Sequence, residues 1–197
     1  MGMSDVIAVT ITADTLAADD DGISASAQVA NNAALVIGGA LASGGSVTLS
    51  NARKLTITSG GNDSGISFTI VGTDINGTAQ TESLTGANAG VATSAAFFLT
   101  IASITAVGDP AGTVKAGISG DSSDIVFAGR SRLKGAYLTS TATAGTVDFL
   151  NTSTAGTSLL KISSVASATA TRDVVIPENG VLFTDGIYLQ YTVSTFL

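Results

Sequence analysis

Apolar and polar side chains alternate with a period of two along much of this chain, and the alternation is broken by glycine, asparagine, aspartate and serine. Residues 47–50 and 54–58 alternate in this way, and residues 6–12 are dense in β-branched side chains. Successive side chains of a strand point to opposite faces of a sheet, so this pattern is typical of strands with one buried face. β-Branched side chains also pack well on a pleated surface. The pattern therefore predicts an all-β chain.

The clearest local prediction is a hairpin over residues 67–84. Residues 67–73 and 78–84 have strand character, and the segment between them contains Asn76 and Gly77. Asn-Gly readily adopts the positive φ angles that tight hairpin turns require. Residues 97–107 are also predicted to be strand rather than helix, because many of their side chains are β-branched.

The chain of 197 residues has room for one large β domain or two small ones. Glycine, serine and aspartate cluster at residues 117–124, which predicts a linker. Short strand-like segments then recur at residues 133–139, 146–150, 158–162, 173–176, 181–184 and 187–193, with a turn composition at residues 177–180. We expect two small antiparallel β domains of the β-sandwich or jelly-roll kind, at residues 1–121 and 122–197.

Charge and hydropathy argue against two kinds of partner. The net charge is −7, from eight lysines and arginines against 15 acidic residues, so no nucleic-acid partner is expected. Mean hydropathy is +0.46, but the longest apolar stretch, residues 33–42, is far shorter than the roughly 20 residues of a membrane-spanning helix. No membrane partner is expected either. Residues 1–5 lack the pattern of a secretory signal, so synthesis in the cytoplasm is expected.

The chain contains no histidine and no cysteine. Histidine general bases, Ser-His-Asp triads, imidazole metal ligands and thiolate nucleophiles are therefore excluded. Only two glutamates are present, Glu82 and Glu178, both in hairpin or turn contexts. A pair of carboxylates acting as in glycoside hydrolysis stays a minor alternative to ordinary solvated charges. We expect no enzyme, no catalytic residue and no cofactor.

The densest acidic cluster consists of Asp14, Asp19, Asp20 and Asp21. Carboxylate oxygens of this kind can bind Ca²⁺, but their spacing does not match the loop of an EF-hand. The favoured interpretation is an exposed acidic turn, and Asp19, Asp20 and Asp21 remain the weak metal candidates.

Residues 129–135 hold three of the eight basic residues, Arg130, Arg132 and Lys134. They are candidates for an interface with an acidic patch on a partner protein or a neighbouring copy, and a solvated strand edge is the alternative. Among the aromatic residues near the carboxyl terminus, Tyr188, Tyr191 and Phe196 are expected to lie in the core or on a sheet face rather than to form a sugar-binding platform.

Two blocks of the chain resemble proteins of one class. Residues 56–77 and 82–86 are similar to a segment common in structural proteins of marine and cyanobacterial tailed bacteriophages. Residues 129–137 and 180–188 resemble the small β domains of the same proteins. The resemblance is more specific for the virion than for a position within it, so head decoration protein, tail component and head fibre all stay open.

That resemblance implies self-assembly, often as trimers on a capsid lattice or as rings in a tail, and contact with the major capsid protein or other virion proteins. The leading hypothesis is a capsid decoration, or cement, protein that is assembled in the host cytoplasm and clamps adjacent capsid subunits. The alternative is a tail or head-fibre component that binds a receptor or glycan. The strands rich in serine, threonine and glycine and the terminal aromatic residues favour this alternative.

Overall fold

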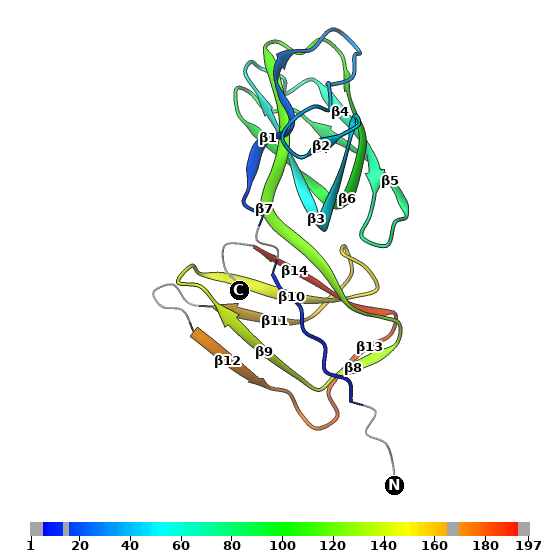
Figure 1. Ribbon diagram of the computed structural model, residues 1–197, viewed down its shortest axis with the longest axis vertical. Coiled ribbons are helices and arrows are strands. Elements are labelled where there is room, and N and C mark those ends of the chain that lie inside the picture. Colours follow the sequence, from blue (N-terminus) through cyan, green and yellow to red (C-terminus); the bar gives the residue numbers. More distant parts are fainter. Residues whose placement is uncertain (1–5, 14–15, 165–169, 193–197) are drawn as a thin grey trace. The chain divides into compact units, whose positions relative to one another are not determined.

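The computed structural model describes residues 6–13, 16–164 and 170–192. These residues form fourteen β-strands and no helix (Figure 1). Their strand pairs are antiparallel, so the prediction of an all-β antiparallel chain is confirmed. The expectations for residues 1–5, Asp14, residue 193 and Phe196 fall outside the described residues. Within the described part of the chain, no helix is long and apolar enough to span a membrane.

The strands divide into two compact units, which we name the central unit (Leu16–Ser123) and the discontinuous unit (described residues 6–13, 124–164 and 170–192). Strand β7 (Thr113–Ala128) starts in the first and ends in the second. The boundary between the two units falls within the segment predicted as a linker, after Ser123, but residues 117–124 continue β7 and form no irregular linker. Residues 6–13 group with the carboxyl-terminal strands and not, as expected, with the first block.

The central unit is built on one antiparallel sheet in the order β7-β3-β6-β4-β5, with β1 paired to β7 and β2 paired to β3. Besides β7, its strands are β1 (Asp19–Gln28), β2 (Ala42–Ser43), β3 (Ser46–Ser59), β4 (Ser67–Thr73), β5 (Ala79–Thr85) and β6 (Val91–Val107). Residues 47–50 and 54–58, predicted as separate strands, are both part of β3.

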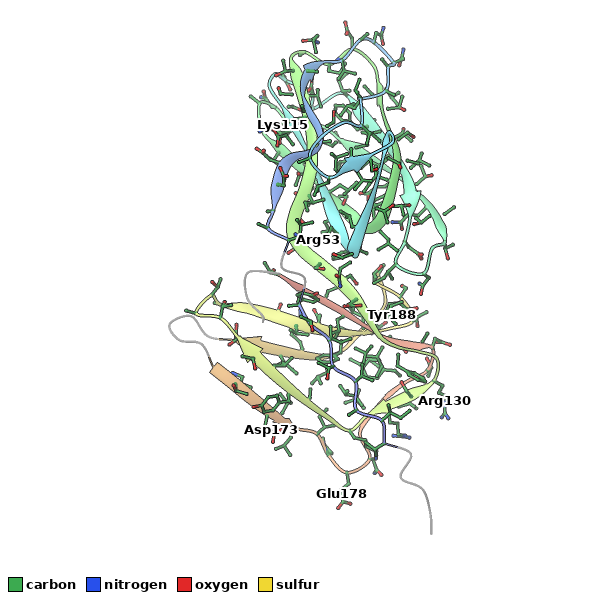
Figure 2. All side chains as sticks on the ribbon, in the orientation of Figure 1. Arg53, Lys115, Arg130, Asp173, Glu178 and Tyr188 are labelled. Carbon is green, nitrogen blue, oxygen red and sulfur yellow. The ribbon has the colours of Figure 1, made fainter. Side chains whose placement is uncertain are left out.

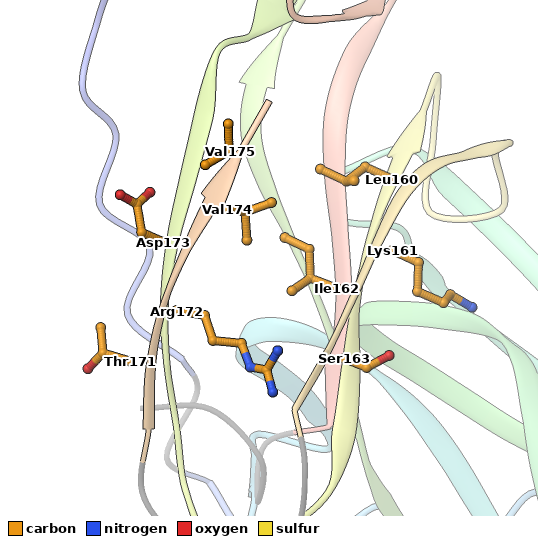
Figure 3. A pocket seen from close by; sticks show the side chains of 9 residues that line it. All are labelled: Leu160, Lys161, Ile162, Ser163, Thr171, Arg172, Asp173, Val174 and Val175. Atoms are coloured by element: carbon orange, nitrogen blue, oxygen red, sulfur yellow. The ribbon is translucent and has the colours of Figure 1, made fainter. Parts of the chain in front are cut away.

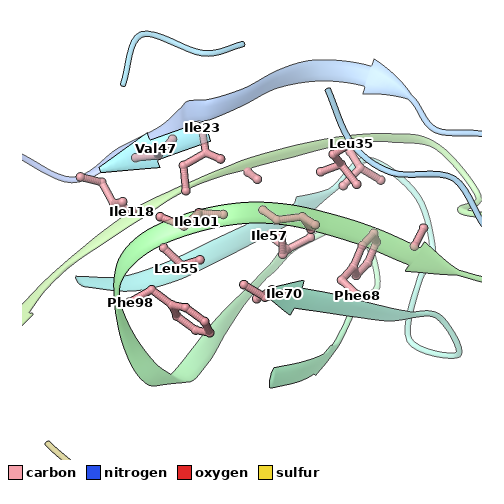
Figure 4. Close-up of a cluster of buried hydrophobic side chains, with 14 of the residues drawn as sticks. Ile23, Leu35, Val47, Leu55, Ile57, Phe68, Ile70, Phe98, Ile101 and Ile118 are labelled. Carbon is pink, nitrogen blue, oxygen red and sulfur yellow. The ribbon is translucent and has the colours of Figure 1, made fainter. Parts of the chain in front are cut away.

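Buried aliphatic and phenylalanine side chains from most of these strands form the core of the central unit (Figure 4). Leu55, Ile57, Phe68, Phe98 and Ile101 are fully buried. Each such side chain contributes about 1.5–3 kcal/mol when it leaves water. The apolar positions of β3, β4 and β6 therefore face one shared core.

The hairpin of β4 and β5 is confirmed, and its first strand has the predicted bounds. Gly77 has a φ of 78°, and its N–H donates to the carbonyl of Asp74 at 3.0 Å. Oδ1 of Asp74 accepts from the backbone N–H groups of Asn76 and Thr78, each at 2.8 Å. An aspartate that receives nearby amides and a glycine with positive φ together fix the turn.

The discontinuous unit is a sandwich of short strands. One layer has the order β11-β10-β14, and the other contains the pairs β9-β12 and β8-β13 (Figure 1). The strands are β8 (Ser131–Leu133), β9 (Gly135–Ser140), β10 (Gly145–Asn151), β11 (Ser158–Ser164), β12 (Ala170–Val175), β13 (Val181–Phe183) and β14 (Gly186–Thr192). Val147, Phe149, Leu189 and Tyr191 of one layer pack with Phe183 of the other. The predicted β-sandwich character is confirmed here.

Two strand predictions are wrong. Residues 6–12 belong to no strand, although they are rich in β-branched residues. Residues 133–139 were expected to be one strand, but Lys134 separates β8 from β9, and these pair with different partners, β13 and β12. In both cases side-chain preference favours extended backbone, whereas a strand also requires a neighbour to receive its hydrogen bonds.

Gly72 on β4 allows a close approach to β6. A Cβ atom at this position would lie 1.9 Å from the carbonyl oxygen of Thr100, and the pairing register shifts between Val71 and Gly72. We expect Gly72→Ala to lower the free energy of unfolding by about 1–3 kcal/mol, because the sheet backbone must move to admit the methyl group. Chemical denaturation measures the change. Gly65→Ala is the matched control, because a Cβ there meets nothing within 4 Å; equal stability of the two variants contradicts the prediction.

Candidate functional site

Three basic side chains lie on one exposed face of the segment around β8. Arg130, Arg132 and Lys134 are exposed, whereas the residues between them, Ser131 and Leu133, are half-buried. Leu133 packs against the core of the discontinuous unit, so the alternation of extended backbone turns its neighbours outward. Figure 2 shows Arg130 projecting from the unit. We call Arg130, Arg132 and Lys134 the basic stripe.

Two members of the basic stripe are held by the turn at residues 177–180. Nη1 of Arg132 donates to the carbonyl oxygen of Asn179 at 2.7 Å, and Nζ of Lys134 donates to that of Glu178 at 2.6 Å. The turn is closed by a hydrogen bond from Gly180 N–H to the Pro177 carbonyl at 2.7 Å. Arginine has five N–H donors and lysine three, so both side chains keep donors for a partner.

Arg130 differs from its two neighbours. It makes no hydrogen bond or ion pair with any of the described residues. The structure thus brings the three predicted interface residues together on one face and leaves the full charge of Arg130 exposed to solvent. A face of this kind can bind carboxylates of another protein surface.

The weak metal candidates Asp19, Asp20 and Asp21 lie at the start of β1, with carboxylate oxygens within 4.8 Å of one another. The interpretation as an acidic turn is wrong, because β1 pairs with β7 here; Asp20 and Asp21 are exposed as expected. Nζ of Lys115 forms an ion pair with Asp20. The hydrogen bond to Asp20 raises the pKa of Lys115. The acidic cluster thus already has a cation beside it, supplied by β7.

The two glutamates have unlike surroundings. Glu82 on β5 accepts from the backbone N–H groups of Ala95 at 2.8 Å and Ala96 at 3.0 Å, one on each carboxylate oxygen. Its position is explained by the amides of β6 that it satisfies. Glu178 is exposed in the turn below the basic stripe, and Figure 2 shows its side chain pointing outward.

Tyr188 and Tyr191 lie in the core, as predicted. Tyr188 is 5% exposed and Tyr191 is 6% exposed. The most exposed aromatic side chain among the described residues of this unit is instead Tyr137 on β9, at 73%. It lies opposite Asp173 of β12 in the antiparallel register, so the two side chains share a face. The sequence analysis missed Tyr137, although its place in an alternating strand could have indicated an outward side chain.

An open groove of about 650 Å³ runs between β11 and β12 (Figure 3). Consecutive residues line it on both sides, residues 160–163 of β11 and 171–175 of β12. Side chains of consecutive strand residues point in opposite directions, so a groove that touches all of them runs along the backbone edges of both strands. Each of these edges ends its sheet: no other described strand pairs with it. Sequence analysis did not predict the groove.

The walls of the groove are mainly apolar, with one cation. Figure 3 shows Ile162 and Val174 pointing into the groove together with Arg172, whereas Lys161 and Asp173 point away from it. Lys161 forms an ion pair with Asp148 at 2.6 Å. The side chain of Arg172 makes neither an ion pair nor a hydrogen bond with the part of the chain that the structure describes.

Comparison with known protein families, with curated proteins and with solved structures finds no match to this chain. The function is therefore argued from the chain itself.

Mutation can distinguish the members of the basic stripe that stabilise the fold from the member that does not. We expect Arg132→Ala to lower the free energy of unfolding by about 0.5–1.5 kcal/mol, because it removes the hydrogen bond to the turn at residues 177–180. Arg130→Ala should leave it unchanged within about 0.5 kcal/mol. Thermal denaturation of both variants measures the difference, and a larger loss for Arg130→Ala would show that our assignment is reversed.

Proposed function

We propose that this chain is a structural protein of a tailed-bacteriophage virion, and that it acts as a capsid decoration protein which binds and stabilises the lattice of the major capsid protein. The observation that carries the proposal is the basic stripe. In a chain with a net charge of −7, three of the eight basic residues are aligned on one exposed face. An acidic chain that gathers cations in one place is suited to an acidic patch on another protein.

The rest of the chain supports a binding role. Histidine and cysteine, which supply the commonest bases and nucleophiles, do not occur in its sequence. A particle protein folds in a reducing host cytoplasm and must then persist outside it, which favours sheets held by burial and by subunit contacts over disulfides. The sequence resemblance to virion proteins points the same way and implies a homo-oligomer, with a trimer as the favoured form.

Image reconstruction of the native particle tests the assignment directly. We expect density for the chain at repeated positions on the capsid lattice, with the basic stripe against acidic residues of the major capsid protein. Density in the tail alone defeats the decoration assignment while leaving the virion class intact.

The role of the basic stripe is tested with capsids that lack the chain. We expect the triple variant R130Q/R132Q/K134Q to bind them about tenfold more weakly than the unchanged chain, because binding loses three charge contacts of the kind that steer and align protein partners. Cosedimentation over a range of salt concentrations measures the affinity, and the salt dependence should also become shallower.

A control variant must change the net charge equally. Substitution of three exposed β5 residues in A79E/T81E/T85E also lowers the net charge by three, but it leaves the basic stripe intact. It should bind like the unchanged chain. Equal weakening of both triple variants would show that overall charge, and not the basic stripe, governs binding.

A second candidate function is a tail or head-fibre component that binds a glycan or receptor. Tyr137 favours it, because this exposed aromatic ring shares a face with the carboxylate of Asp173 and with Val175, which is 91% exposed. A flat ring beside a hydrogen-bond acceptor is a surface on which a sugar can stack.

The fibre function is tested by glycan-array binding and by adsorption to host cells. If it holds, Tyr137→Ala should lower binding at least about tenfold, because one aromatic anchor often dominates such a contact. Tyr137→Phe should keep most of it, since the ring remains. A decoration protein should bind no glycan at all, so a blank array favours the first candidate.

A further inference from the structure

We infer that two copies of this chain associate by strand addition: residues 6–10 of one copy enter the groove between β11 and β12 of the other. This inference deepens the self-association in the proposed function, but it concerns the purified chain and does not depend on binding to a capsid. Three observations carry it: the open strand edges in the groove, the strand-like character of residues 6–10, and the matching lengths of these residues and the groove.

The groove has the form of a vacant strand position. It follows the backbone edges of β11 and β12, and neither edge pairs with another described strand. Unpaired edges of this kind offer backbone donors and acceptors to an added chain. Charged side chains often protect an edge; here Lys161 and Asp173 point away from the groove, and Arg172 points into it. Its apolar wall includes Ile162, which is 7% exposed, and Val174.

Residues 6–10, Val-Ile-Ala-Val-Thr, have the composition of a strand but do not form one. Ile7 is 74% exposed and Val9 is 47% exposed. Farther along, Ile11 and Ala13 pack against the core of their own discontinuous unit and so anchor the segment. The outer part therefore has apolar side chains exposed to solvent while its inner end is fixed. We call residues 6–10 the arm.

The lengths of the arm and the groove match. The arm has five residues, and the groove is lined by residues 171–175 of β12. At about 3.3 Å per residue, an extended arm spans the lined part of the strand. An arm that alternates its side chains can place them toward the wall of the groove while its backbone pairs with the edge of β11.

The neighbouring strands set the direction of the arm. The pairs β10-β11, β10-β14, β9-β12 and β8-β13 of this unit are antiparallel, so we place the arm antiparallel to β11. In Figure 3, Leu160 lies toward the Val175 end of the groove and Ser163 lies toward Arg172. An antiparallel arm therefore begins beside Ser163 and Arg172, with Ile7 opposite Ile162 and Val9 opposite Leu160.

Cysteine cross-linking tests the inference cleanly, because the natural chain has no cysteine. The single variants Ile7→Cys and Ile162→Cys, carrying tags of different mass, are mixed and oxidised. We expect a disulfide-linked heterodimer, because paired neighbours bring Cα atoms within the roughly 4.4–6.8 Å that a disulfide needs. Lys161→Cys is the matched control, since this residue is adjacent on the same strand but points away from the groove.

Two results of this experiment would overturn the inference. One is equal cross-linking of Ile7→Cys to Ile162→Cys and to Lys161→Cys, or to neither. The other is a disulfide within one chain in the double variant I7C/I162C at high dilution, which would show that the arm occupies its own groove.

A second pair of cysteines tests the direction. We expect Val9→Cys to cross-link to Leu160→Cys, because an antiparallel arm places Val9 opposite Leu160. Cross-linking of Val9→Cys to Ile162→Cys and of Ile7→Cys to Leu160→Cys instead overturns the antiparallel placement. The same variants are then measured for capsid binding. If the chain binds capsids but shows no cross-link, only the inference of strand addition is wrong. If it cross-links but binds no capsid, only the decoration assignment is wrong.

Discussion

The pairing of β3 with β6 on one side and with β7 on the other holds the central unit together. Both ladders change register beside Arg53, since β3 and β6 shift on either side of it and β3 and β7 shift directly after it. Arg53 is fully buried, and its guanidinium donates to the carbonyls of Leu16 and Ser119. A buried cation must find acceptors, and it finds one on β7, beside the register shift, and one in the segment before β1. The arginine therefore ties the start of this unit to the pair of β3 and β7.

Two glycines allow strands of the central unit to approach each other closely. A Cβ at Gly117 would lie 1.9 Å from the carbonyl oxygen of Asp19, so β1 can lie against β7 only because this position has no side chain. Gly72 does the same between β4 and β6. In a chain with 23 glycines and few large aromatic side chains, close backbone contact replaces bulky packing at these points.

The sequence predicts those parts of the fold that depend on contacts between residues close together in the chain. The hairpin of β4 and β5 was predicted with its turn, because Asp74, Asn76 and Gly77 act on neighbouring residues. The basic stripe was predicted for the same reason, since a period of two places Arg130, Arg132 and Lys134 on one side. The linker at residues 117–124 was wrong because small polar residues also suit a strand that is covered closely by others, as β7 is by β3.

The groove between β11 and β12 could not be predicted, because it depends on which strand edges remain unpaired. The sequence of β11 resembles that of an ordinary strand, and nothing in it states that its sheet ends there. The groove exists because β11 closes one layer of the sandwich and β12 closes the other, which is a property of the topology.

The two units also end their sheets in different ways, and this difference bears on assembly. In the central unit, the outer strand β5 carries Glu82, whose carboxylate is bound to two amides of β6, and its apolar residues are few. Such an edge gives an approaching strand little apolar surface to bury. In the discontinuous unit, the edges of β11 and β12 instead border apolar side chains. Because hydrogen bonds alone contribute little net free energy in water, an edge favours association where apolar burial accompanies it. The unit that carries the basic stripe is thus also the one in which unpaired edges border apolar side chains.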